Sequence, residues 1–267
     1  MPVKEDEARE IAGYMRKGEL VAASDGSTWR SRNAFGLCLG VRPNPKLWGT
    51  ANEVEGHPVA SDRSELAGIL ALVEYLSLVA EWAEIETEMT IYCDNKFAVD
   101  FAKRPVMGKS PQWSDRRNFD LKLEMVRRLK STRLKIDFEH VKGHQDKVMT
   151  YDELPYEAKM NFHCDAMAKK EVRRLQKETR RTIQSCPASV GVMVRDSEGF
   201  LTEGVKGYLY RNEYCEEVME LIRVGPDEMR NIDWEALWSV LRKQNWATSI
   251  YRLMWGDNPT KTRLFQK

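Results

Sequence analysis

Four acidic residues, each in a different segment of this chain, occupy positions where a carboxylate is structurally unfavourable. Two of them, Asp25 and Asp94, end short apolar runs, Glu65 opens a strongly apolar helical stretch, and Asp165 lies inside a helical pattern. Strand ends and the first turn of a core helix are half-buried, and an unpaired charge there is costly. Four converging carboxylates are tolerated when they share divalent cations, because hard cations prefer oxygen ligands. The pattern favours a fold that joins the four segments around a metal site.

The spacing of apolar residues predicts the order of strands and helices. The expected strands are 20–24, 35–41, 47–54, 89–93 and 134–141, and the expected helices are 4–17, 62–80, 96–102, 114–129 and 155–177. Gly26 and Ser27 are expected to form a turn after the first strand, and Asp62 is expected to cap the long second helix. This order predicts an α/β fold with a mixed five-stranded sheet flanked by helices.

The chain is expected to have three parts. Residues 1–18 form an N-terminal helical extension, and residues 19–183 form the main domain. A basic helix end is then followed by Cys186 and Pro187, which break the pattern. Residues 184–267 are therefore predicted to be a small α+β appendage, made of a hairpin near residues 190–205 and tryptophan-rich helices.

Composition limits the class of protein. The 42 basic and 41 acidic residues give a net charge of +1, so any affinity for nucleic acid must come from local clusters. The five cysteines form no metal-binding spacing, which favours a reducing compartment and no structural zinc. The N-terminus is too charged for a signal peptide, and no apolar run reaches transmembrane length. We expect a soluble intracellular protein with no membrane partner, or a module of a larger one.

Five short sequence blocks carry a resemblance to a known family. They are SDGS at 24–27, RSEL at 63–66, IYCDN at 91–95, VKGH at 141–144 and NFHCDAMA at 161–168. One block would mean little, since Asp-Gly-Ser alone is common in turns, but five blocks in this order on the expected strands and helices are highly specific. Residues 19 to about 180 resemble a type 1 ribonuclease H domain, the enzyme that cuts the RNA strand of an RNA–DNA hybrid. The resemblance implies a ribonuclease H-like sheet and an RNA–DNA hybrid as partner.

The resemblance also implies functional residues. The catalytic carboxylates of the family carry over to Asp25, Glu65, Asp94 and Asp165, as ligands of two Mg²⁺ ions for which Mn²⁺ can substitute, and its mobile histidine carries over to His144. Substrate contacts within the matched blocks are expected at Gly26, Ser27, Asn95 and Asn161. Trp113 is a further candidate on its own chemistry, because an aromatic ring among nearby cations suits contact with sugars and phosphates.

Phosphodiester hydrolysis needs an activated water and stabilisation of a departing oxygen. Two Mg²⁺ ions about 4 Å apart can provide both. We expect Asp25 to bridge the ions, Glu65 and Asp94 to hold the ion on the leaving-group side, and Asp165 to hold the ion that activates water. His144 follows a predicted strand and a glycine, and an imidazole there suits proton transfer or product release.

Each acid also has an ordinary structural explanation. Asp25 could be a turn residue, Glu65 could complement the helix dipole, and Asp94 could cap the next helix. Asp165 could simply pair with Lys169 one helical turn away. These explanations must all hold together, and they do not account for the order of the blocks, so catalysis is favoured.

Three departures from compact cellular members refine the resemblance. The loop between His144 and Asp165 is longer, the stretch between the second and fourth helices is shorter, and Asp62 and Lys96 replace polar amides that many relatives use to contact the hybrid. Such departures are similar to ribonuclease H domains attached to retroelement reverse transcriptases, so a reverse transcriptase domain in the same polyprotein is an expected partner. The alternative is a non-catalytic nucleic-acid-binding module of such a polyprotein, but such modules usually lose acids and this chain keeps four. Another nuclease or an integrase of the same superfold is a further alternative, which the last two blocks disfavour.

Overall fold

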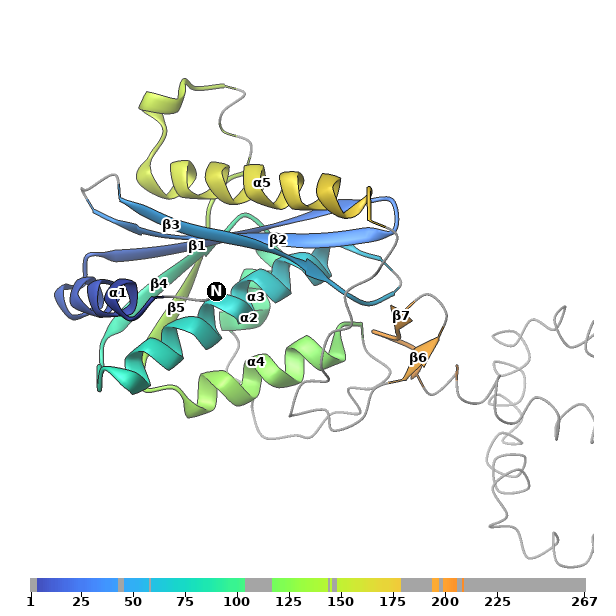
Figure 1. The fold of residues 1–267 in the computed structure, drawn as a ribbon, viewed down its shortest axis with the longest axis horizontal. Helices are drawn as coiled ribbons and strands as arrows, with labels where there is room; N and C mark the ends of the chain where they lie inside the picture. Colours follow the sequence, from blue (N-terminus) through green and yellow to red (C-terminus); the bar gives the residue numbers. More distant parts are fainter. Residues whose placement is uncertain are drawn as a thin grey trace, which may run out of the picture. The chain divides into compact units, whose positions relative to one another are not determined.

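A mixed sheet of five strands forms the centre of the computed structural model (Figure 1). Its strands are β1 (Leu20–Trp29), β2 (Arg32–Val41), β3 (Leu47–Val54), β4 (Glu88–Cys93) and β5 (Lys135–His140). They lie in the order β3-β2-β1-β4-β5, with β1 antiparallel to β2 and parallel to β4. The expected mixed five-stranded sheet is confirmed.

The structure describes part of the chain, namely residues 4–42, 46–57, 59–103, 117–143, 145, 148–178, 194–196, 199–205 and 208. The chain divides into two compact units, residues 1–206 and 207–267, and nearly all described residues belong to the first. Within these residues, the structure contains no helix with the length and apolar character needed to span a bilayer.

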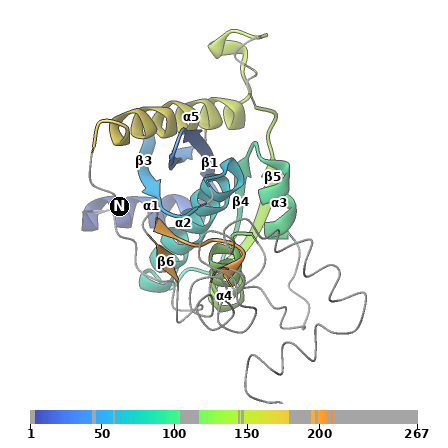
Figure 2. The ribbon, with the colours of Figure 1, turned by 90° about the vertical axis from the view of Figure 1, so that its right-hand side faces the viewer.

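Helices cover both faces of the sheet (Figures 1 and 2). They are α1 (Glu5–Lys17), α2 (Ser61–Trp82), α3 (Lys96–Lys103), α4 (Phe119–Ser131) and α5 (Tyr156–Leu175). Helix α5 packs on one face, against β1 and β2, and α2 packs on the opposite face with α4 beside it. Leu66, Ile69 and Leu76 of α2 are fully buried at helical spacing, so the long helix forms the centre of the core.

The expected N-terminal helix is present and belongs to this core. Ile11, Ala12 and Met15 of α1 are buried at helical spacing. Gly18 ends the helix at φ 68°, a left-handed conformation that glycine adopts without steric penalty.

Strand β1 is longer than the sequence predicted, and the expected turn at Gly26 and Ser27 is wrong. Both residues continue the antiparallel ladder, where Gly26 pairs with Phe35. The chain reverses only after Trp29. Glycine is needed at position 26 because a Cβ atom there would lie 2.5 Å from Ser64 Oγ and 2.8 Å from the backbone nitrogen of Glu65. The residue that suggested a turn instead permits close packing of β1 on the start of α2.

The start of α2 is fixed by contacts with α4 rather than by a cap of its own. The N-cap residue is Ala60, so the expected cap at Asp62 is wrong. Asp62 Oδ2 accepts a hydrogen bond from Asn118 Nδ2 at 3.0 Å. The buried Arg63 guanidinium donates to both carboxylate oxygens of Asp120, at 2.9 and 2.7 Å. A bidentate ion pair therefore joins the first turns of the two helices.

The expected hairpin after residue 190 is present in short form, as β6 (Arg195–Asp196) and β7 (Gly199–Phe200). The segment from Phe200 to Thr202 packs on His57 and on the start of α2. The His57 backbone donates to Phe200 O and accepts from Thr202 N, both at 3.0 Å, and Phe200 covers the Arg63 guanidinium at 4.8 Å. The boundary expected near residue 184 thus falls inside the first unit, while the expected tryptophan-rich helices lie outside the described residues.

Candidate active site

The register between two strands brings Asp25 and Asp94 together. In the parallel pairing of β1 with β4, Ser24 lies opposite Cys93. The next residue of each chain is an aspartate, so both acids emerge at the same place in the sheet. Asp25 is buried, whereas Asp94 is partly exposed just beyond the end of β4.

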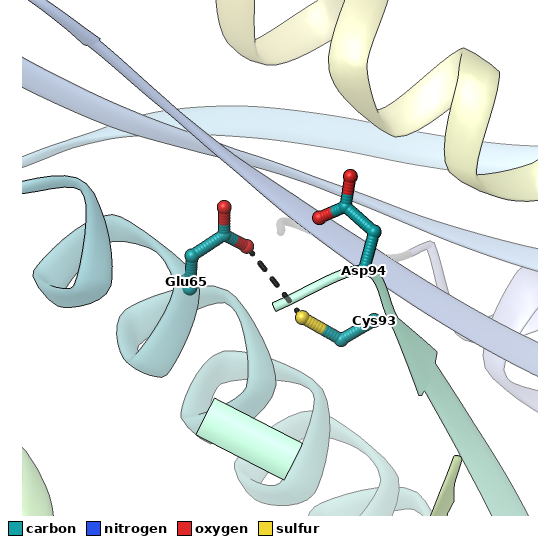
Figure 3. Close-up of side chains that lie close together, drawn as sticks. All are labelled: Glu65, Cys93 and Asp94. Atoms are coloured by element: carbon teal, nitrogen blue, oxygen red, sulfur yellow. Dashed lines mark hydrogen bonds between the residues drawn. The ribbon is translucent and has the colours of Figure 1, made fainter. Parts of the chain in front are cut away.

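Glu65 reaches this place from the first turn of α2. Its Oε2 accepts a hydrogen bond from Cys93 Sγ at 3.5 Å, as Figure 3 shows. Candidate ligand atoms of Glu65, Cys93 and Asp94 all lie within 4.8 Å of one another. Two carboxylates from different elements are therefore close enough to bind one cation.

Helix α5 contributes from the other face of the sheet. Asn161 Nδ2 donates to Asp25 Oδ2 at 3.2 Å. Asp165 lies one helical turn further on, and both residues line a pocket with Asp25. The same pocket is lined by Lys142 and Gln145.

The carboxylates perturb one another electrostatically. Burial, followed by the charges of Asp94 and Asp165, raises the pKa of Asp25 to about 8. Burial, with the charges of Asp25 and Asp94, raises the pKa of Glu65 well above its usual value. Hydrogen bonding from the Gly26 backbone opposes both shifts. Such a cluster is unfavourable unless protons or cations neutralise it.

The donor set suits a hard divalent cation. Carboxylate oxygens are the ligands that Mg²⁺ and Mn²⁺ prefer. Cys93 is a poor ligand for such ions, because burial and the Glu65 charge raise the pKa of its thiol well above the usual value. The protonated thiol instead donates to Glu65 and orients it.

Two contacts that position Asp94 were not anticipated from the sequence. His140, opposite Cys93 in the β4–β5 pairing, places Nε2 2.9 Å from the Asp94 carbonyl oxygen. A carbonyl can only accept, so this nitrogen carries the proton. A Cβ atom on Gly143 would overlap Asp94 Oδ2, so a side chain at this position would displace the carboxylate. The matching VKGH block was the signal for Gly143, whereas His140 had none.

The remaining predicted site residues have separate environments. Ser27 lies within β1, and Asn95 Oδ1 accepts from Ala98 N at 3.0 Å, so Asn95 caps α3. The ordinary partner considered for Asp165 is present, since Lys169 Nζ lies 2.6 Å from Asp165 Oδ2 on an exposed surface. His144 and Trp113 lie outside the described residues.

Neither a protein-family model nor a curated protein matches this chain. Several solved structures are similar to it. The N-terminal RNase H domain of a Mycobacterium tuberculosis protein, solved as a fusion with maltose-binding protein, is 14% identical over 59% of this chain and 96% of that chain, with a TM-score of 0.40. The chain is similar to ribonuclease H domains. A second, LC11-RNase H1 from compost, solved with an RNA/DNA hybrid, is 10% identical over 60% of this chain and 100% of that chain, with a TM-score of 0.44. A third, the prototype foamy virus RNase H domain, is 15% identical over 58% of this chain and 95% of that chain, with a TM-score of 0.45.

Proposed function

We propose that this chain is a metal-dependent endonuclease that hydrolyses the RNA strand of RNA–DNA hybrids. The observation that carries the proposal is the meeting of Asp25, Glu65 and Asp94, from two adjacent strands and a helix start, with raised pKa values at the two buried acids. Mutual repulsion of this kind is relieved by divalent cations. Asp165, in the pocket with Asp25, completes the set.

Each acid has a distinct place in this proposal. Asp25 would be shared by two ions, because it lies close to both Glu65 and Asp165. Its charge raises the pKa of Glu65, and the charge of Asp165 raises the pKa of Asp25. Glu65 and Asp94 would hold the ion on the leaving-group side, and Asp165 the ion on the water side. The ions would supply an activated water and stabilise the departing ribose oxygen. Asp165 must first release Lys169, which costs little because exposed ion pairs contribute about 0–1 kcal/mol. His144 would assist proton transfer.

The hybrid substrate rests on the five sequence blocks, whereas a reverse transcriptase domain as covalent partner rests on the departures of this chain from compact cellular members. A protein of this kind would select hybrids by duplex shape and 2′-hydroxyls across the minor groove rather than by base sequence. The non-catalytic alternative predicts binding without cleavage, so one experiment separates the two.

Cleavage of matched RNA–DNA, RNA–RNA and DNA–DNA duplexes with and without Mg²⁺ tests the reaction, and Asp94→Asn tests the ligand set. We expect Mg²⁺-dependent cleavage of the hybrid alone. Asp94→Asn should abolish it while leaving hybrid affinity in EDTA unchanged, because the substitution removes one ligand charge and no groove contact.

The matched control is Asp100→Asn, an exposed acid on α3 that carries the same change of charge. It should cleave like the parent. Cleavage by Asp94→Asn within a few-fold of the parent would remove Asp94 from the ligand set, and a parent that binds hybrid without cutting it would favour the non-catalytic module.

A further inference from the structure

Three aromatic rings cluster on the surface beside the candidate active site. Tyr151 lies in η3 (Tyr151–Glu153), and Phe162 and His163 are consecutive in α5. Their ring centroids are 5.7 to 5.9 Å apart in tilted, edge-on arrangements. Tyr151 Oη and His163 Nε2 are hydrogen-bonded at 2.7 Å. Tyr151 and Phe162 nonetheless remain 44% and 38% exposed.

The buried packing of the preceding loop on α5 is already provided by other side chains. That packing comes from Leu154 and Ala158, which form a small buried cluster with Val141. The turn of η3 is closed locally, since Thr150 and Glu153 form a capping box. The rings of Tyr151 and Phe162 contact each other between η3 and α5, but neither belongs to this buried packing and both stay exposed.

The position of Phe162 connects the cluster to the acids. Phe162 lines the same pocket as Asp25 and Asp165, and it precedes Asp165 by three residues, so the two share a helix face. A strand bound with its phosphate at the carboxylates would therefore bring a nucleotide close to this ring.

Cations accompany the rings. Lys159 Nζ lies 5.4 Å from the centroid of Tyr151, and the exposed Lys142 lines the pocket. Aromatic faces interleaved with lysines suit a nucleic acid, since rings pack on sugars or bases and ammonium groups neutralise phosphates. Binding of an apolar protein partner would not require these lysines.

We propose that the Tyr151–Phe162–His163 cluster binds the ribose–phosphate backbone of the cleaved strand beside the scissile phosphate, with Phe162 as the principal contact. This inference rests on the proposed function. It assigns Phe162 to substrate positioning, so its removal should affect KM for the hybrid more than kcat.

The test compares Phe162→Leu, which keeps apolar bulk without a ring, with Phe162→Tyr, which restores the ring, in the full chain. We expect Phe162→Leu to raise KM and the dissociation constant for a short RNA–DNA hybrid about 5- to 20-fold, within the range found for loss of one stacking contact. Phe162→Tyr should bind like the parent. Trp82→Ala is the matched control, because Trp82 is a similarly exposed ring at the far end of α2 from Glu65.

The possible failures are distinguishable. A parent that neither binds nor cuts the hybrid overturns the proposed function and this contact together. A parent that cuts the hybrid, with an unchanged KM in Phe162→Leu, overturns the contact alone and leaves the rings as a surface for a protein partner. Equal weakening in both Phe162 variants, with equally lowered melting temperatures, would make the rings structural and also overturns it.

Discussion

Asp25 and Glu65 are nearly buried carboxylates that face further negative charge. The folded protein retains the Asp25 proton up to about pH 8, whereas an unperturbed aspartate releases it near 3.8. Between these values the folded state binds more protons than the unfolded chain. The stability of the metal-free protein therefore falls as pH rises across this window.

This linkage predicts that Asp25→Asn stabilises the metal-free protein while it removes cleavage. The gain in the free energy of unfolding should be small at pH 4 and reach roughly 2–5 kcal/mol at pH 8, since each unit of pKa shift corresponds to about 1.4 kcal/mol. Asparagine keeps an acceptor oxygen for Asn161 Nδ2. Urea denaturation in EDTA at both pH values measures the effect, and Mg²⁺ should stabilise the parent but not the variant. A variant less stable than the parent at pH 8 would contradict the electrostatic account.

At the scale of single residues, the sequence indicated which acids come together but not which neighbouring side chains contact them. The acids stand at recognisable places, after apolar runs or at a helix start. The contact of the Cys93 thiol with Glu65 depends on how β4 packs on α2, and the contact of the His140 ring with the Asp94 carbonyl depends on the register of β4 against β5. No local sequence pattern encodes either. His144 and Trp113 stay predictions.

At the scale of elements, the error over β1 has a physical cause. Glycine and serine are typical of turns, so the local pattern ends the predicted strand at residue 24, just before Asp25. The antiparallel ladder continues to pair β1 with β2 over the five residues from Asp25 to Trp29, and the close approach of α2 requires a missing side chain at Gly26. Asp25 therefore sits within a rigid strand, with its carboxylate held by Asn161 from the opposite helix.

Gly26→Ala should consequently harm both stability and cleavage. The new methyl group would overlap Ser64 Oγ and lie 2.9 Å from Glu65 Cδ, so the start of α2 must shift. We expect a loss of roughly 1–3 kcal/mol in the free energy of unfolding, typical of overpacking, and at least a tenfold loss of cleavage through displacement of Glu65. Thermal melting and initial rates measure both quantities.

The matched control is Gly13→Ala in α1, where an added Cβ meets no atom within 4 Å. It should leave cleavage unchanged and should stabilise the helix by about 0.5–1 kcal/mol. If Gly26→Ala behaved like this control, the crossing of β1 over α2 would not constrain Glu65.

At the scale of the whole molecule, the extent of the first unit depends on contacts remote in sequence. The sequence predicts that the main domain ends near Cys186 and Pro187, because the sequence reveals only local patterns and these residues break the preceding helix. The segment around Phe200 nevertheless packs on Arg63, beside Glu65 in the sequence, and Asn118 N donates to Thr202 O at 2.8 Å. The segment thus covers the ion pair that joins α2 to α4.

Two truncated proteins test how much of the chain the catalytic unit needs. A protein ending at Lys206 should keep the melting temperature of the first unit and its cleavage rate, because this is where the compact unit ends.

A protein ending at residue 184 loses the buried side chains of Phe200 and Leu201, each contributing about 1.5–3 kcal/mol when fully buried. The same truncation leaves the Arg63 guanidinium exposed. We expect it to fold around the intact sheet, with a free energy of unfolding several kcal/mol lower and weaker cleavage from a loosened α2. Urea denaturation and hybrid cleavage by the two proteins side by side measure the difference. Equal stability would return the boundary to residue 184 and make the hairpin part of the appendage.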